Sequence, residues 1–468
     1  MELETPRIVI AGLSGDSGKT LTALGLAAAL RARGVAVAPY KKGPDYIDAA
    51  WLGLAAGRPA RNLDSFLAPP EAILRSAARG ADAGLILVEG NRGLFDGMDE
   101  AGSHSTAALA RRLGAPVLLV VDATKATRTV AAMVLGCRMM EPDLDIGGVI
   151  LNRVATRRQE RLIRRTVEST VGVPVLGAIP RLGGGGPLPG RHLGLVTVQD
   201  HPEARRAVEA AAAAVEAHVD LGGVLDIARK RSRRLSVPGP LTVGSGSPFR
   251  LAVARDEAFC FYYPDNLEAL EAAGAEIAWF SPLHDAALPA GSAGVYLGGG
   301  FPELHARALA DNGSLRAELR EAAVSGAPVW AECGGLMALA RELRIDGRRY
   351  PMAGVLDLVV EQTARPRGHG YAAGRIEGST PWFEPGEPVR GHEFHYSRVA
   401  GGDDAGRTAL GLDRGTGIGA GRDGVVKGRV WASYLHLHAA SAPGWAGRFA
   451  ALCAGGTACV AETAAAGA

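Results

Sequence analysis

The sequence predicts an α/β protein of two domains, the first of which is built on a mostly parallel sheet. Short apolar runs alternate along the chain with helical patterns rich in Ala, Leu and Arg, which is typical of βαβ units. A basic stretch with Pro, Gly and Ser interrupts this alternation after residue 225, and 468 residues suffice for two domains. We therefore expect domains over 1–225 and 249–455, a linker over 226–248 and a flexible tail over 456–468.

Apolar runs of strand length mark the expected elements in chain order. In the first domain they lie at 7–12, 35–40, 84–90, 116–123, 146–154 and 173–180. In the second domain they lie at 250–256, 276–280, 294–300, 327–335 and 429–438. The stretch "KTLTALGLAAALRARG" follows the first run directly and reads as a helix that ends at Gly34. Strands therefore alternate with helices in both halves, which predicts an α/β domain in each half.

The composition describes a soluble globular protein. Hydrophobic residues make up 47% and charged residues 21% of the chain, and the net charge is +2. This balance gives no reason to expect binding to nucleic acid or to a membrane. The five cysteines are scattered without metal-like spacing, which suits a reducing compartment. With no signal peptide and no apolar run of membrane-spanning length, we expect the cytoplasm.

The stretch "IAGLSGDSGKT" predicts a phosphate-binding loop between the first strand and the first helix. Five residues separate Gly12 from Gly18, one more than in the common P-loop pattern. Backbone N–H groups, the Lys19 ammonium and the Thr20 hydroxyl, a candidate Mg²⁺ ligand, would surround the phosphates. A tight turn that merely needs glycines is the plainer alternative, but Gly-Lys-Thr at a helix start favours the cradle. The expected nucleotide-binding residues are Gly12, Ser14, Gly15, Asp16, Ser17, Gly18, Lys19 and Thr20.

Acidic residues follow two of the predicted strands and support the phosphate site. Glu89 ends an apolar strand, where a carboxylate can reach a metal ion. Asp45 and Asp48 follow "YKKGP", and Asp96 lies seven residues beyond Glu89. A single acidic residue is usually solvated surface, but the carboxyl ends of strands are where α/β sheets bind ligands. At another strand end, the Asn152 amide is a candidate for reading an adenine edge.

The stretch "APVWAECGGLMALA" places Cys333 between an apolar strand and a helical pattern, as in a nucleophile elbow. A buried inert thiol is the plainer alternative for one cysteine. Two partners favour catalysis: the glycines of "GVYLGGGFPE" for an oxyanion hole, and His436 with His438 in "SYLHLH". A His-x-His pair is also compatible with a metal site. Together these residues indicate acyl transfer, and we expect hydrolysis of an amide.

Taken together, these motifs resemble the cobyrinic acid or hydrogenobyrinic acid a,c-diamide synthase family of cobalamin biosynthesis, and the resemblance covers nearly the whole chain. It rests on "KKGPDYID", "EGNRGLFDG", "LPGRHLGLV", "YLGGGFPE", "AECGGLMAL", "RGHEFHYS" and "SYLHLH" in this order. The N-terminal half is similar to dethiobiotin synthetase, including its longer glycine spacing. The C-terminal half resembles the class I glutamine amidotransferases. The expected fold is therefore a P-loop synthetase domain fused to an α/β amidotransferase domain.

The resemblance implies roles for the residues of the C-terminal half. Cys333 would attack the side-chain amide of glutamine with His436 as its base, and His438 is a possible third member where the class usually has Glu. Gly299, Gly300 and Gly334 would supply the oxyanion amides.

In the N-terminal half, ATP and Mg²⁺ would convert the a and c carboxylates of the corrinoid into acyl phosphates, which ammonia then displaces. Thr20, Asp45 and Glu89 are the implied metal ligands, and Asp48 and Asp96 would orient metal or substrate. Asn152 would contact adenine, and the ammonia would reach this half through the interior. The implied partners are the corrinoid acid, L-glutamine and ATP, with a homodimer as a possible assembly. Outside this site, "RGHEFHYS" and Arg191-His192 are candidates for contacts to acidic corrinoid side chains.

Several other functions are compatible with parts of the pattern. Cobyric acid synthase amidates other carboxylates of the macrocycle, but "GPDYID" and the "HLH" region differ from its motifs. An enzyme that amidates a nickel sirohydrochlorin is not excluded by "GPDYID". A non-catalytic amidotransferase-like protein is disfavoured by Cys333 and His436. A P-loop partitioning ATPase would carry an early lysine where Ser14 stands, and it would lack the C-terminal half.

Overall fold

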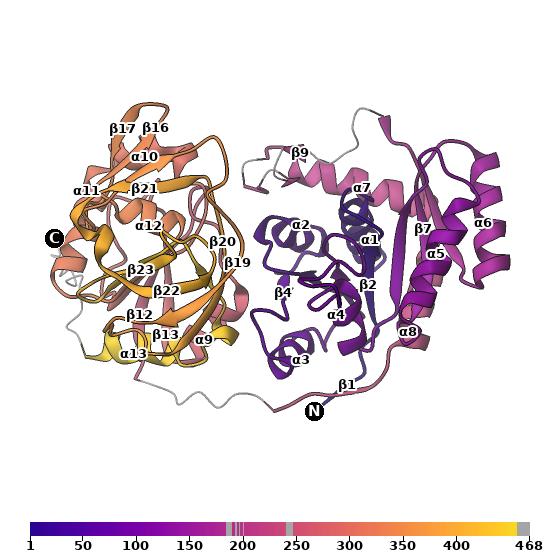
Figure 1. Ribbon diagram of the computed structural model, residues 1–468, viewed down its shortest axis with the longest axis horizontal. Coiled ribbons are helices and arrows are strands. Elements are labelled where there is room, and N and C mark those ends of the chain that lie inside the picture. Colours follow the sequence, from indigo (N-terminus) through magenta and orange to yellow (C-terminus); the bar gives the residue numbers. More distant parts are fainter. Residues whose placement is uncertain (184–189, 192–193, 196, 200, 240–246, 456–468) are drawn as a thin grey trace, which may run out of the picture. The chain divides into compact units, whose positions relative to one another are not determined.

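The computed structural model describes residues 1–183, 190–191, 194–195, 197–199, 201–239 and 247–455, and the chain divides into two compact units. Unit 1 is Met1–Pro240 and unit 2 is Leu241–Ala468, each with its own sheet and core (Figure 1). The predicted tail, residues 240–246 of the predicted linker and part of the "LPGRHLGLV" motif lie outside the described residues.

Unit 1 is built on a parallel sheet of seven strands in the order β4-β3-β5-β2-β6-β7-β8. The strands are β2 (Arg7–Gly12), β3 (Val37–Lys42), β4 (Arg61–Leu63), β5 (Leu85–Glu89), β6 (Val117–Asp122), β7 (Ile146–Val154) and β8 (Val175–Pro180). This confirms the predicted parallel sheet. The short edge strand β4 was not predicted, because three residues leave too little pattern to detect.

Helices cover the sheet of unit 1. They are α1 (Lys19–Ala32), α2 (Tyr46–Ala56), α3 (Pro70–Ala78), α4 (Thr106–Arg112), α5 (Thr129–Met140), α6 (Arg157–Val171), α7 (Ala204–His218) and α8 (Leu221–Arg231). Helix α1 packs closely on α7, since a Cβ at Gly25 would lie only 2.3 Å from Cγ2 of Val215. Burial of this apolar interface holds α1, and with it the glycine loop before α1, against the sheet.

The predicted linker begins too early, because residues 226–231 form the end of α8. The following strand β11 (Leu235–Ser236) pairs antiparallel with β1 (Glu2–Leu3), and the buried Arg7 guanidinium donates to the carbonyls of Leu113 and Arg233. The basic run "RKRSRR" therefore belongs to unit 1, between the last turn of α8 and β11. Cations in the last turn of a helix are stabilised by the helix dipole, although the same composition is typical of a solvated linker.

Unit 2 is built on a mixed sheet of ten strands in the order β13-β12-β14-β15-β24-β23-β22-β19-β20-β25. The first five strands run parallel: β13 (Ala275–Phe280), β12 (Phe249–Ala254), β14 (Gly294–Leu297), β15 (Val329–Glu332) and β24 (Val430–Ser433). The others form antiparallel pairs: β23 (Arg422–Lys427), β22 (Thr408–Arg414), β19 (Gly368–Ile376), β20 (Pro388–His395) and β25 (His436–Leu437).

A smaller sheet and several helices complete unit 2. The four strands of this sheet follow the order β17 (Arg348–Pro351), β16 (Glu342–Ile345), β18 (Val359–Gln362) and β21 (Ser397–Gly401). The α-helices are α9 (Pro264–Ala272), α10 (Ala306–Asp311), α11 (Gly313–Val324), α12 (Gly334–Leu339) and α13 (Trp445–Ala454). The 3-10 helices are η2 (Pro302–His305), η3 (Asp403–Gly406) and η4 (Ala439–Ser441).

An aromatic cluster fixes the register of β15 against β24. Trp330 and Trp431 are register partners, and their rings stack with centroids 5.4 Å apart. Both are buried, so replacing either by Ala should cost about 3–5 kcal/mol of stability. The same register brings the Cys333 amide to the Ser433 carbonyl at 2.7 Å. The cluster thereby positions the chain segment that carries Cys333 beside the segment that leads to His436.

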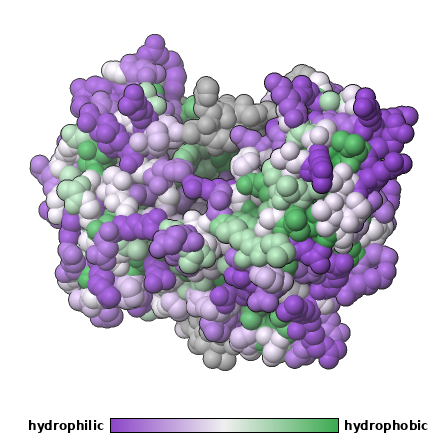
Figure 2. All heavy atoms as spheres, turned by 45° about the vertical axis from the view of Figure 1, so that its right-hand side comes forward, coloured by the Kyte–Doolittle hydropathy of each residue, from purple (hydrophilic) through white to green (hydrophobic). Residues whose placement is uncertain are grey.

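The surface is mainly hydrophilic on the face shown in Figure 2, with hydrophobic residues in smaller groups between polar ones. Among the helices of the described residues, none is long and apolar enough to cross a membrane.

Candidate functional site

The glycine loop of unit 1 lies between β2 and α1, as the sequence predicts. Gly18 adopts a left-handed conformation with φ 98°, and a Cβ there would lie 2.0 Å from Nδ2 of Asn152. Glycine is therefore required for both reasons. Lys19 starts α1, and its Nζ donates to the Ser14 carbonyl at 2.8 Å. The lysine thus bends back over the loop, so its ammonium group would lie close to a phosphate bound there.

Asn152, at the end of β7, braces this loop. Its buried side-chain amide donates to the Ser17 carbonyl at 2.9 Å. This contact was not predicted from the sequence, because it joins residues 135 positions apart. The contact of Asn152 with adenine stays a prediction.

A buried charged cluster lies at the ends of β3 and β5, beside the loop. Thr20 Oγ1 donates to Glu89 Oε1 at 2.6 Å, and Lys41 Nζ lies 3.0 Å from the same carboxylate and 2.6 Å from Asp48 Oδ2. Burial alone would lower the pKa of Lys41, but Asp48 and Glu89 raise it above its ordinary value. Burial raises the pKa of Glu89, and Lys41 opposes this. Burial also lowers the pKa of Lys19, with Lys41 as the second cause.

Sequence reasoning missed Lys41. Its signal was a lysine pair at the end of an apolar run and directly before the acidic pair of "KKGPDYID". A lysine buried at 3% exposure requires charged partners, and the two carboxylates supply them.

Two of the predicted acidic residues make local contacts in the structure. Asp45 caps α2 by accepting the Asp48 amide, and burial, with Asp48 as the next cause, raises its pKa to about 7. Asp96 accepts the Gly93 amide at 2.8 Å in the loop after β5. Within the described residues, no three His, Cys, Asp or Glu side chains are arranged to hold a metal ion.

Mg²⁺ fits the residues at the loop nonetheless. In the described part of the chain, Glu89 Oε2 is buried without a hydrogen-bond partner, while Thr20 lies at the other carboxylate oxygen. A hydroxyl and a carboxylate at the phosphate loop are the donors that Mg²⁺ takes from P-loop proteins, because it keeps waters and phosphate oxygens as its remaining ligands.

In unit 2, Cys333 stands at a sharp turn between β15 and α12. Its backbone is strained, with φ 48° and ψ −95°, and its side chain is 4% exposed. A nucleophile elbow has this geometry, since the strained turn lifts the side chain off the strand end. The Sγ atom faces the Phe394 carbonyl at 3.9 Å.

The glycines after β14 lie against both predicted catalytic residues. A Cβ at Gly299 would lie 2.2 Å from Cε1 of His436, and a Cβ at Gly334 would lie 3.1 Å from the Gly300 amide nitrogen. The end of β14 therefore touches His436 on one side and the turn after Cys333 on the other. The structure brings together the five predicted residues of the amidotransferase site: Gly299, Gly300, Cys333, Gly334 and His436.

The surroundings of the Cys333 thiol favour its protonated form. Burial, with Glu303 as the second cause, raises its pKa, and a hydrogen bond from Gly334 opposes this only in part. Burial raises the pKa of Glu303 itself to about 7. A thiol in these surroundings remains protonated near neutral pH, so Cys333 could act as a nucleophile only beside a base such as histidine.

The motif "RGHEFHYS" lies in this site. On β20, His392 is the register partner of His436 on β25, and the two ring centroids are 6.2 Å apart. Burial, and next the charge of His436, lowers the pKa of His392 to about 3, so His392 stays neutral. The motif is also a candidate for corrinoid contacts, which stays a prediction. The pairing of β20 with β25, which has no local sequence signature, brings it beside His436 and Cys333.

His438 makes different contacts from those of His436. It caps η4, where its Nδ1 accepts the Ala440 amide at 3.2 Å, and its ring lies 4.8 Å from that of Tyr263. Only His436 of the pair lies in β25, because the strand ends at Leu437. The expectation that one strand carries both histidines is therefore wrong.

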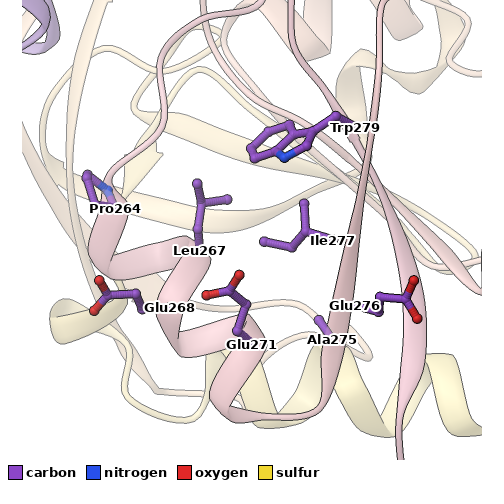
Figure 3. Close-up of a pocket in the computed structure, with 8 residues that line it drawn as sticks. All are labelled: Pro264, Leu267, Glu268, Glu271, Ala275, Glu276, Ile277 and Trp279. Carbon is purple, nitrogen blue, oxygen red and sulfur yellow. The ribbon is translucent and has the colours of Figure 1, made fainter. Parts of the chain in front are cut away.

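A separate pocket of about 490 Å³ lies between α9 and the edge strand β13. Leu267, Ile277 and Trp279 point toward one another in it, and Glu271 reaches in between them (Figure 3). No residue of the predicted sites lines it, so it is not part of the amidotransferase site.

The two sites define the class of this protein: a P-loop nucleotide-binding unit on one chain with a glutamine amidotransferase unit. Residues 8–192 match the CobQ/CobB/MinD/ParA nucleotide binding domain, and residues 250–444 match the CobB/CobQ-like glutamine amidotransferase domain.

Relatives match over nearly the full length. Cobyrinate a,c-diamide synthase of Magnetococcus marinus is 42% identical, over 95% of this chain and 97% of its own. Its counterpart in Syntrophotalea carbinolica is 41% identical, over 97% and 100%. Hydrogenobyrinate a,c-diamide synthase of Streptomyces coelicolor is 43% identical, over 96% and 97%. The chain belongs to this a,c-diamide synthase family of cobalamin biosynthesis, and it is a glutamine-dependent carbon–nitrogen ligase.

Proposed function

We propose that this enzyme uses ATP and glutamine to amidate the a and c carboxylates of cobyrinic or hydrogenobyrinic acid. The observation that carries the proposal is the presence on one chain of a P-loop with a Thr20–Glu89 pair and of a cysteine elbow beside His436. The first can activate a carboxylate and the second can release ammonia. The names of the full-length relatives support the substrate.

Glutamine hydrolysis follows from the residues of unit 2. His436 takes the proton of the Cys333 thiol as sulfur attacks the side-chain amide carbon of glutamine. The amides of Gly299, Gly300 and Gly334 donate to the resulting oxyanion, and their buried position strengthens these hydrogen bonds. His436 then gives the proton to the leaving nitrogen, so that ammonia departs and a thioester remains. Water, deprotonated by His436, hydrolyses the thioester to glutamate and returns the thiol.

Carboxylate activation belongs to unit 1. The loop amides from Gly12 to Gly18 and the Lys19 ammonium would hold the ATP phosphates, and Thr20 with Glu89 would hold Mg²⁺. When bound, Mg²⁺ neutralises charge that develops on the phosphates. A carboxylate oxygen of the substrate attacks the γ-phosphorus, and ADP leaves. Ammonia then attacks the acyl carbon, phosphate leaves with the former carboxylate oxygen, and the amide remains.

The acidic residues beside the loop fit a role in orientation. Lys41 ties Asp48 to Glu89, so displacement of one carboxylate changes the charge around the others. We propose that Asp45 and Asp48 order the metal and the substrate carboxylate through this cluster, and that Asp96 acts from the loop after β5.

A substrate panel tests the proposal. The enzyme is incubated with ATP, Mg²⁺ and glutamine, and with cobyrinic acid, hydrogenobyrinic acid or nickel sirohydrochlorin, and mass spectrometry counts the amides. We expect two amides on one or both corrinoid acids. Two amides on nickel sirohydrochlorin alone, or four on a corrinoid, would overturn the assigned substrate.

The acyl phosphate is tested with the preferred substrate labelled with ¹⁸O in its carboxylates. One labelled oxygen should appear in inorganic phosphate for each amide formed. Unlabelled phosphate would contradict the acyl phosphate.

A further inference from the structure

Glu332 is the last residue of β15 and directly precedes Cys333. Its side chain is completely buried. An isolated carboxylate in such a place is strongly unfavourable, so its partners indicate why it is there.

Each carboxylate oxygen of Glu332 has defined neighbours. Oε1 accepts the Trp330 indole N–H at 2.9 Å and the Leu437 amide at 3.3 Å. Oε2 accepts the Tyr296 hydroxyl at 3.3 Å and lies 3.8 Å from Nδ1 of His436. The carboxylate therefore binds the backbone directly after His436 and also faces the ring of His436.

We propose that Glu332 is the positioning carboxylate of the Cys333–His436 pair. Facing Nδ1, it selects the tautomer in which Nδ1 carries the proton, which leaves Nε2 free to take the thiol proton. Once His436 is protonated, the negative charge of Glu332 stabilises the imidazolium. The inference deepens the glutaminase half of the proposed function and rests on it.

The residue at the usual third position of the class does not offer the same chemistry. His438 cannot supply a negative charge, and its Nδ1 accepts the Ala440 amide at the start of η4. In this chain the carboxylate instead comes from the residue before the nucleophile. Because β15 and β24 are parallel neighbours, the end of β15 lies beside the segment that leads from Ser433 to His436.

The experiment must separate positioning from simple anchoring of the fold, and Glu332→Gln does so. The new side chain keeps an oxygen for Trp330 and Leu437 but turns an N–H₂ group toward Nδ1 of His436. That group favours the tautomer with its proton on Nε2, which cannot accept the thiol proton. A comparable change in a serine protease triad lowers kcat by about 10⁴. Because 3.8 Å is longer than a hydrogen bond, we expect a loss of at least ~10²-fold here.

The measured quantities are kcat and KM for glutamine hydrolysis, ammonium-dependent amidation and the melting temperature. For Glu332→Gln we expect kcat to fall, while KM for glutamine and the ammonium-dependent rate stay within threefold of wild type. Glu332→Asp keeps the charge and should retain at least tenfold more glutaminase activity than Glu332→Gln. If Glu332→Gln does not fold, the Asp variant provides the test: a folded Glu332→Asp without activity above that of Cys333→Ala would overturn the inference.

Asp404→Asn is the matched control. Asp404 is also buried, and its carboxylate accepts the Asp357 amide at 2.7 Å and the Lys427 ammonium at 2.9 Å, but neither it nor these partners belong to the predicted sites. This variant should keep kcat within threefold. Wild-type kcat in Glu332→Gln, or equal losses in both variants, would overturn the role of Glu332. Glutaminase activity in Cys333→Ala would instead overturn the proposed function itself.

Discussion

Replacing Gly299 by Ala should disable glutamine hydrolysis without unfolding the protein. The new Cβ would lie 2.2 Å from Cε1 of His436 and 3.1 Å from its Nδ1. His436 is 2% exposed, so its ring cannot swing into solvent to make room. The backbone at Gly299 does not need glycine for its φ, so the clash with His436 is the main perturbation.

The size of the effect follows from this distance. Ordinary contact begins at 3.4 Å, so the ring must retreat by about 1.2 Å. A displacement of about 1 Å in a reacting group costs roughly 10²-fold in rate. We therefore expect kcat/KM for glutamine hydrolysis to fall by about 10²-fold, measured as glutamate release. Amidation with ammonium chloride should remain at the wild-type rate.

Gly447→Ala is the control for this experiment. Gly447 lies within α13 and a Cβ there meets nothing within 4 Å, so this variant should be fully active and up to about 1 kcal/mol more stable. If Gly299→Ala hydrolyses glutamine as fast as Gly447→Ala, then His436 does not occupy the position that we describe, and the assignment of the base is wrong.

Three further predictions concern single side chains. Lys19→Ala should lower ATP-dependent amidation by at least ~10²-fold and leave glutaminase activity, because only the phosphate contact is lost; equal losses in both assays would contradict this. Asn152→Ala should weaken binding of ATP more than binding of GTP, because the predicted adenine contact is lost together with the hydrogen bond to the loop at Ser17; equal weakening of both would show that the amide only supports the loop. For Glu303→Gln, urea unfolding at pH 5 and pH 8 is compared with wild type. Burial raises the pKa of Glu303 to about 7 from 4.5, so the folded protein holds this proton more tightly and wild type loses stability as pH rises from 4.5 to 7. Between pH 5 and pH 8, the free energy of unfolding of the variant should therefore rise by about 1–3 kcal/mol relative to that of wild type. A difference that does not depend on pH would refute the shift.

The features that could be predicted from the sequence are those with a local signature. Most strands of the seven-stranded sheet and the five parallel strands of unit 2 are largely apolar runs, whereas the antiparallel strands β19, β20, β22 and β23 are not and were not predicted. The glycine loop and the cysteine turn each lie within about ten residues. Gly18 lies where the backbone adopts a left-handed conformation, and Cys333 lies at a strained turn with positive φ. Predictions of this kind depend on neighbours in the chain, so one sequence suffices.

The features that were missed depend on residues distant in sequence. In the sequence Lys41 resembles a surface lysine, because only the pairing of β3 with β5 places it beside Glu89. The role of Glu332 depends on contacts with Leu437 and His436, which lie more than a hundred residues later in the chain. The motif "RGHEFHYS" lies beside Cys333 because β20 pairs with β25, and the basic end of α8 has the composition of a linker. Composition and spacing carry no information about such pairings.

The division of labour between the two units is tested most directly by Cys333→Ala with the preferred corrinoid acid, ATP and a labelled nitrogen source. With ¹⁵N-ammonium, mass spectrometry should show two ¹⁵N amides per product, and with amide-¹⁵N-glutamine it should show none. Amides from glutamine, or loss of amidation with both nitrogen sources, would contradict the account.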